Sequence, residues 1–141
     1  MISIENKVID TVNRDVTAVY PNATVEGGYN PTPDSFPYIT VFEMDNFMPE
    51  RVQDNLNREL YVQVMYEVNV YTNDTVKELT AKKIADLVDE TVRGMKFLRT
   101  SRLQTPNVDR TIYRITMRYR AVVMAGSTED GTTYYQLFHR I

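Results

Sequence analysis

The chain has 141 residues, a formal net charge of −3 and no cysteine. This length predicts a single domain, residues 1–141, large enough to bury a substantial core. The absence of cysteine excludes disulfides, thiol nucleophiles and zinc–thiolate sites, and the acidic balance argues against a chain-wide electrostatic grip on nucleic acid. No apolar run approaches the ~20 residues that a membrane-spanning helix needs, and no basic segment followed by an apolar block indicates a secretory signal.

An amphipathic pattern covers the first twenty residues. Between Ser3 and Tyr20, apolar residues recur every four positions, which is the spacing of one face of a helix. Ser3 is the expected N-cap of this helix, and Pro21 is expected to end it. A short strand is predicted next, over residues 23–26.

Two strand patterns follow, separated by a polar segment. Tyr38–Glu43 is rich in aromatic and β-branched residues, and Leu60–Tyr71 alternates between apolar and polar residues, as a half-buried strand does. At about 3.3 Å per residue the second strand spans about 40 Å, so it should cross the whole domain or project beyond it. Met44–Glu59 is polar except around Phe47–Pro49, and we expect it to be a long exposed connection.

A second helix is predicted over Thr75–Met95. Thr75 and Glu78 have the spacing of a capping box. The expected apolar face consists of Val76, Thr80, Ile84, Leu87, Val88, Thr91 and Met95. Arg99–Asp109 is polar, and we interpret it as a connection with a turn at Pro106–Asn107.

The C-terminal part is predicted to be a strand hairpin. Thr111–Met124 alternates as a second long strand, Gly126–Gly131 contains the turn dipeptide Asp-Gly, and Thr132–Phe138 returns as the last strand. The order of elements predicts an α+β fold: a mainly antiparallel sheet with two long strands and two amphipathic helices packed on one face.

No catalytic constellation stands out. The single histidine, His139, lies two residues from the end of the chain, and no glycine-rich phosphate loop is present. Asp86, Asp89 and Glu90 sit among basic residues on the second helix, which is typical of a solvated face. The alternative is a divalent ion held by Asp86 and Glu90 in a small metal-dependent enzyme. We expect no enzyme activity, no metal and no cofactor.

Two features suggest contacts with other molecules. Four arginines fall on one face of the last long strand: Arg110, Arg114, Arg118 and Arg120. They either face solvent, pair with carboxylates of another subunit, or contact a polyanion. Phe47 and Met48, close to Arg51, either tuck onto the chain's own core or anchor a partner.

The long strands also bear on assembly. Projecting strands expose unpaired edges unless something covers them. A closed ring of identical subunits would cover them with one repeated contact.

The whole order of segments resembles the tail-terminator and minor head–tail joining proteins of tailed bacteriophages. The segments that carry this resemblance are the N-terminal helix, Val25–Tyr29, Phe36–Phe42, Leu60–Tyr71, Thr75–Met95 and Tyr113–Arg120. Together they cover essentially the whole chain.

The resemblance implies a structural role in the virion. Proteins of this family form a ring, usually hexameric, that caps the tail tube, stops its polymerisation and offers a docking surface to the head connector, while DNA passes through without specific binding. Such a protein assembles in the cytoplasm of the host bacterium. Candidate contacts with neighbouring subunits or the tail tube are Phe47, Met48, Arg51, Arg114, Arg118 and Arg120.

Three other functions remain open at this stage. The chain could be another neck, baseplate or tail-tube component of the same virion. It could also be the carboxylate-based metal enzyme described above, or an adaptor that binds peptides along a free sheet edge.

Overall fold

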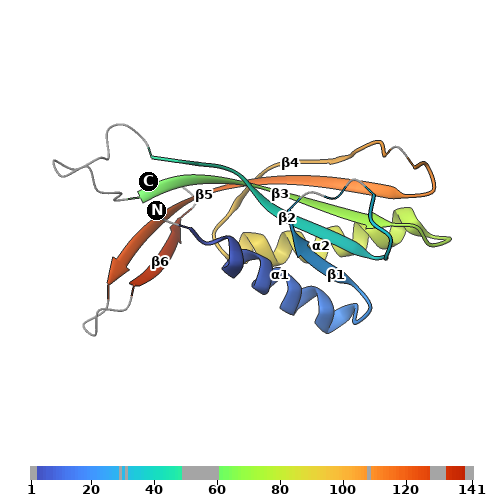
Figure 1. The fold of residues 1–141 in the computed structure, drawn as a ribbon, viewed down its shortest axis with the longest axis horizontal. Coiled ribbons are helices and arrows are strands. Elements are labelled where there is room, and N and C mark those ends of the chain that lie inside the picture. Colours follow the sequence, from blue (N-terminus) through green and yellow to red (C-terminus); the bar gives the residue numbers. More distant parts are fainter. Residues whose placement is uncertain are drawn as a thin grey trace.

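The computed structural model describes residues 3–28, 30, 32–48, 61–107, 109–127 and 133–138. Helices α1 (Glu5–Val19) and α2 (Lys77–Gly94) lie on one face of a twisted sheet (Figure 1). The sheet consists of β1 (Thr24–Gly27), β2 (Tyr38–Phe47), β3 (Tyr61–Thr72), β4 (Leu98–Gln104), β5 (Tyr113–Ser127) and β6 (Thr133–Phe138). This is the predicted α+β fold.

The sheet has two different borders. Its strand order is β1-β2-β3-β5-β4, and β6 also pairs with β5. β1 and β2 are parallel, and all other pairs are antiparallel. β3 occupies one edge of β5 along Tyr113–Met124, so β4 and β6 share its other edge, on Ile115–Arg120 and Val122–Ser127. One border is therefore formed by β4 and β6, and the other by β1 and the end of β2.

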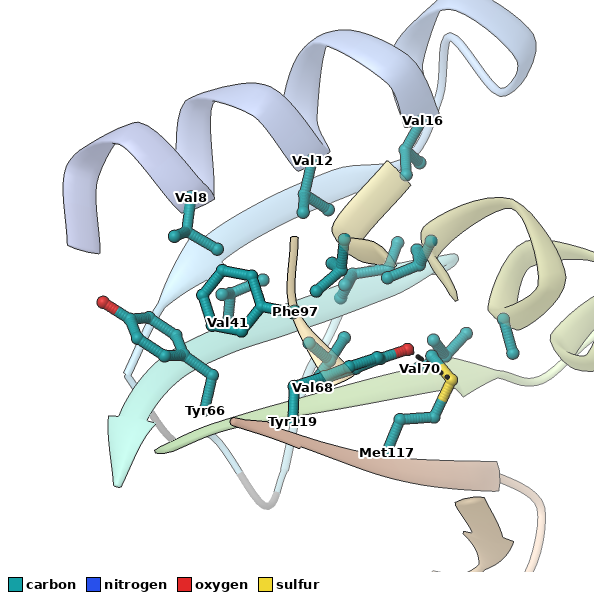
Figure 2. Close-up of a cluster of buried hydrophobic side chains, with 14 of the residues drawn as sticks. Val8, Val12, Val16, Val41, Tyr66, Val68, Val70, Phe97, Met117 and Tyr119 are labelled. Atoms are coloured by element: carbon teal, nitrogen blue, oxygen red, sulfur yellow. Dashed lines mark hydrogen bonds between the residues drawn. The ribbon is translucent and has the colours of Figure 1, made fainter. Parts of the chain in front are cut away.

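The core lies between the helices and the sheet. Val8, Val12 and Val16 of α1 are buried and point toward the sheet (Figure 2), as their four-residue spacing predicts. Phe97, just after α2, packs edge-on between two tyrosines: its ring centroid is 5.4 Å from that of Tyr66 and 6.5 Å from that of Tyr119. Such edge-to-face pairs add to the stability gained from burial alone.

Both predicted helix caps are wrong. The N-cap of α1 is Ile4 and not Ser3, and it makes no side-chain cap hydrogen bond; burial of Ile4 in the core fixes the start of the helix instead. The capping box of Thr75 does not form either. Asp74 takes its place, because its carboxylate accepts hydrogen bonds from the Val76 amide (3.1 Å) and the Thr80 hydroxyl (2.9 Å).

Two segments predicted to be connections contain strand. β2 continues to Phe47, so the first part of the predicted connection Met44–Glu59 is strand, with a bulge between Glu43 and Asp45. Within Arg99–Asp109, residues up to Gln104 belong to β4, which has a bulge between Arg99 and Ser101. An edge strand pairs on one side only and tolerates polar side chains, so apolar and polar residues need not alternate along it.

The predicted faces of α2 and β5 also need correction. Val76 is exposed, and the buried face of α2 is Ala81, Ile84, Ala85, Val88, Asp89, Thr91 and Val92. β5 begins at Tyr113, so Arg110 lies in the preceding turn and not on the strand. There the Arg110 carbonyl accepts a hydrogen bond from Lys77 Nζ (3.4 Å).

β3 is more deeply buried than a half-buried strand. From Tyr66 to Thr72 every residue is buried, including Glu67 and Asn69. These polar residues lie on the face away from the helices, opposite residues of β2 and β5. The alternating pattern of Leu60–Tyr71 correctly predicted which residues face the helices. It was wrong about the other face, where Glu67 and Asn69 contact polar side chains instead of solvent.

Candidate interaction surface

The sheet face opposite the helices, called the open face from here on, carries three of the predicted arginines. Directly paired residues of neighbouring strands share one face of a sheet. Tyr66 pairs with Tyr119 under the helices, so Arg114, Arg118 and Arg120, at alternating positions of β5, lie on the open face. The structure therefore brings these three side chains to one surface, as predicted.

Two of the arginines are held by partners within the chain. Arg118 Nε donates a hydrogen bond to Glu67 Oε1 (3.1 Å), and Asn69 Nδ2 donates to Glu67 Oε2 (3.1 Å). Asn69 Oδ1 accepts from Arg114 Nε (2.9 Å) and from the Thr116 hydroxyl (2.8 Å). We call these five residues the polar ladder. It neutralises a buried carboxylate, and it fixes both guanidinium groups in position.

Aromatic rings extend the polar ladder toward β1. The Arg114 guanidinium lies 5.5 Å from the centroid of the Tyr71 ring, a cation–π contact, and the Tyr71 and Tyr38 rings are 6.2 Å apart. The Tyr38 hydroxyl donates to Glu26, and burial together with this hydrogen bond raises the pKa of Tyr38. This end of the open face is thus built from contacts between residues of the same chain.

Exposed apolar side chains also occur on the open face, spread over β2, β4 and β5. They are Phe47 (41% exposed), Leu98 (41%), Leu103 (52%) and Met124 (38%). Pairing places Leu98 beside Arg120, which is exposed, and Leu103 beside Thr116. Aromatic, methionine and arginine side chains are enriched at protein interfaces. We call Phe47, Leu98, Leu103, Arg120 and Met124 the apolar–arginine patch.

The predicted contact residues divide between this surface and the rest of the chain. Phe47 is the last residue of β2 and belongs to the apolar–arginine patch, and Met48, which follows it, is half-buried. Arg114 and Arg118 belong to the polar ladder, and Arg120 to the patch. Arg51 and His139 lie outside the described residues, as do residues 49–59 of the predicted connection and 128–131 of the predicted turn.

Two acidic side chains of α2 form ion pairs with arginines of β4. Asp89 is buried (6% exposed) and accepts hydrogen bonds from the Tyr119 hydroxyl (2.7 Å) and Arg99 Nη1 (2.9 Å). Asp86 pairs with Arg102 Nη1 (2.6 Å). Burial and the Asp89 hydrogen bond raise the pKa of Tyr119 well above its usual range. Asp89 therefore does not lie on a solvated helix face, and the prediction of such a face is wrong for this residue.

This network bears on the metal-enzyme alternative. In the part of the chain that the structure describes, no group of three or more His, Asp or Glu side chains is arranged to hold a metal ion. Asp86, one of its two proposed ligands, pairs with Arg102 instead. Sequence reasoning missed Arg99 and Arg102 because it left β4 unassigned. Their spacing of three matches that of Asp86 and Asp89, and this is the signal that could have paired them.

A comparison of the sequence with protein-family models gave no match, and a comparison with curated proteins gave none either. In the described ranges, neither helix is long and apolar enough to span a membrane.

Proposed function

We propose that this protein is a structural component of a bacteriophage virion, a tail terminator. It forms a ring that caps the tail tube, stops tube polymerisation and provides the docking surface for the head connector. The observation that carries the proposal is the apolar–arginine patch, which lies on a sheet face that neither described helix covers. Several large apolar side chains exposed on the same sheet face favour an interaction surface.

The scaffold beneath the patch suits a binding role. The patch lies on paired strands of one sheet, beside guanidinium groups that the polar ladder holds in fixed positions. A surface of this kind presents preformed contacts and loses little conformational entropy on binding. The element order also retains the helix, short strand, strand, long strand and helix on which the resemblance to tail terminators rests.

Charge supports the passage of DNA through such a ring. The chain carries a net charge of −3, and Arg118 on the open face is paired with Glu67. Affinity for a duplex grows with the number of phosphates that a protein neutralises. A ring of these subunits would offer few free cations to hold DNA in its channel.

Negative-stain electron microscopy of the purified protein over a concentration series tests the proposal. We expect closed rings with a central hole wide enough for duplex DNA, and a solution mass of about six chains. Purified rings added to polymerising tail-tube subunits of the same virus should shorten the tubes. Unlimited tubes of this protein alone would indicate a tail-tube subunit instead. A monomer at all concentrations that also fails to bind tubes would contradict the proposal and favour the adaptor function.

A further inference from the structure

The long strand β3 separates two exposed surfaces of the subunit. Phe47, the last residue of β2, pairs with Gln63 near the start of β3. At the other end, the Thr72 hydroxyl donates a hydrogen bond to the Lys77 carbonyl (2.7 Å), so the first residues of α2 lie there. From Gln63 to Thr72 the strand spans roughly 30 Å. The end of β2 and the start of α2 therefore lie at opposite ends of the molecule (Figure 1).

An open hollow lies at the start of α2, and its volume is about 490 Å³. It is lined by Thr75, Val76, Lys77, Glu78, Leu79 and Lys82. Val76 and Leu79 are more than half exposed, although both side chains are large and apolar. Clefts of this volume accommodate drug-sized molecules, so one aromatic side chain fits. We call this feature the α2 hollow.

Each of the two surfaces carries a charge beside its apolar residues. Asp45 lies two residues before Phe47, on the same face of β2. It is exposed, and among the described residues its carboxylate accepts a hydrogen bond only from the Asn46 amide (2.9 Å). Lys83 follows Leu79 by about one turn, on the same face of α2. It is exposed too, and it makes no ion pair in the described part of the chain.

The spacing between charge and apolar residue is nearly the same on both surfaces. Asp45 and Phe47 are about 6.6 Å apart along β2, and Leu79 and Lys83 are about 6 Å apart along α2. When Phe47 of one copy enters the α2 hollow of another, Asp45 therefore reaches Lys83. Two copies of the same surface would instead bring like charges together, which opposes that pairing.

We infer that Phe47 of one subunit occupies the α2 hollow of the next copy of this chain, with Asp45 paired to Lys83. The inference rests on the proposed function and deepens it, because it names the contact that repeats around the ring. Since the two surfaces lie at opposite ends of the molecule, each subunit uses one surface for each neighbour. Such a head-to-tail contact closes into a ring when the rotation between subunits allows it.

Cysteine cross-linking tests the contact directly, because the chain has no cysteine of its own. A short bis-maleimide suits the pair better than a disulfide, whose Cβ atoms must lie closer than those of a Lys–Asp pair. Asp45→Cys mixed with Lys83→Cys should give a cross-linked dimer, and neither variant should do so alone. Asp45→Cys mixed with Glu90→Cys, two turns further along α2, is the matched control and should cross-link at least tenfold less. Equal cross-linking at both positions, or a dimer from one variant alone, overturns the inference.

Charge exchange on the full chain provides a second readout. Asp45→Lys and Lys83→Asp should each raise the concentration needed for assembly at least tenfold, because each places like charges in the contact. A chain with both substitutions restores opposite charges and should assemble within about threefold of the unmodified protein. Thermal melts show whether each variant is folded, and sedimentation velocity measures assembly. Folded single variants that assemble normally, or a double variant without rescue, overturn the pairing of Asp45 with Lys83.

A chain with both Asp45→Cys and Lys83→Cys separates this inference from the proposed function. Within one chain the two positions lie on opposite sides of the sheet, because Asp45 is on the open face and α2 covers the other. A ladder of cross-linked species that stops at one size supports both the contact and a closed ring. A ladder without limit supports the contact and contradicts a terminator. Rings in the microscope without the cross-link overturn the contact and leave the function standing.

Discussion

Asp89 shows how one buried carboxylate joins a helix to two strands. It lies on α2 and accepts hydrogen bonds from Tyr119 of β5 and Arg99 of β4, with Arg93 of its own helix 3.5 Å away. A buried carboxylate without such partners would be strongly destabilising. Asp89 is the oxygen acceptor for the buried Tyr119 hydroxyl. That hydroxyl also lies 3.3 Å from the Met117 sulfur (Figure 2).

We predict that Asp89→Ala lowers the free energy of unfolding by about 2–3 kcal/mol, because it removes the acceptor of a buried hydroxyl and leaves Arg99 unpaired. Asp86→Ala is the matched control. The Asp86 side chain is 70% exposed, and its ion pair with Arg102 should contribute under about 1 kcal/mol. Urea denaturation at pH 7 measures both. Equal losses of unfolding free energy would show that the buried contacts of Asp89 stabilise the fold no more than the exposed ion pair of Asp86 does.

The second residue-scale prediction concerns pH. Burial raises the pKa of Glu43 above its usual value of 4.5, against the hydrogen bonds from Tyr66 and Asn46, and the nearby carboxylates Glu5 and Asp45 raise it further. Folding therefore favours the protonated carboxyl. The charged form imposes no penalty below pH 4.5, and its penalty grows as the pH rises through the folded-state pKa.

Glu43→Gln should accordingly gain stability relative to the unmodified chain as the pH rises from 4 to 7, because the amide cannot ionise. Thermal melts at several pH values measure the difference. Asp45→Asn, at an exposed neighbouring position, should show no comparable gain. A stability difference for Glu43→Gln that stays constant over this range would contradict the raised pKa.

At the scale of elements, α1 illustrates packing by periodicity. Val12 is fully buried against the sheet, whereas Val19, at the end of the same helix, is exposed. Val12→Ala should cost about 2 kcal/mol through lost burial and a residual cavity. Val19→Ala should change stability by less than about 0.5 kcal/mol. Denaturant unfolding compares them, and similar costs would mean that the buried face of α1 is assigned wrongly.

Strand β4 shows what a border position does to a sequence pattern. Its outer edge pairs with no described strand, and two of its side chains, Arg99 and Arg102, reach α2 to pair with Asp89 and Asp86. The element is held by backbone pairing with β5 and by these ion pairs. Neither produces an alternating apolar sequence, so β4 is not visible in Arg99–Asp109 without the partner strand.

At the scale of the whole molecule, the three open-face arginines serve different purposes. Arg118→Glu would place a second carboxylate beside Glu67. That variant would therefore test folding as well as assembly. Arg120 has no ion pair among the described residues and is the cleaner probe. Arg120→Glu should leave the melting temperature nearly unchanged and raise the concentration needed for assembly about tenfold. Sedimentation velocity and thermal melts measure the two effects. An unchanged assembly concentration would show that Arg120 faces solvent and makes no contact between subunits.

Phe47 and Met48 provide the second assembly prediction. The double substitution Phe47→Ala with Met48→Ala should weaken oligomerisation by at least tenfold while lowering the melting temperature by only a few degrees, because Phe47 is substantially exposed in the single chain. Size-exclusion chromatography over a dilution series reports the oligomer. If the melting temperature collapses while the oligomer persists, these residues belong to the core of the subunit.

The fold class and most helices and strands could be predicted from the sequence alone. Four-residue spacing in α1 and strict alternation in β3 and β5 report which face is buried, because an apolar stripe must find a core wherever it lies. The same alternation placed Arg114, Arg118 and Arg120 on one face. These properties are local, and a single strand or helix carries enough residues to express them.

The residue that lies opposite each position became known from the three-dimensional structure. It showed that Glu67 and Asn69 hold two of the arginines, that Asp89 is buried, and that Arg99 and Arg102 of β4 pair with Asp89 and Asp86 of α2. Each of these facts joins residues from different strands or from a helix and a strand. Their partners are set by strand order and register, which depend on how the whole chain packs and leave no local pattern in any one segment.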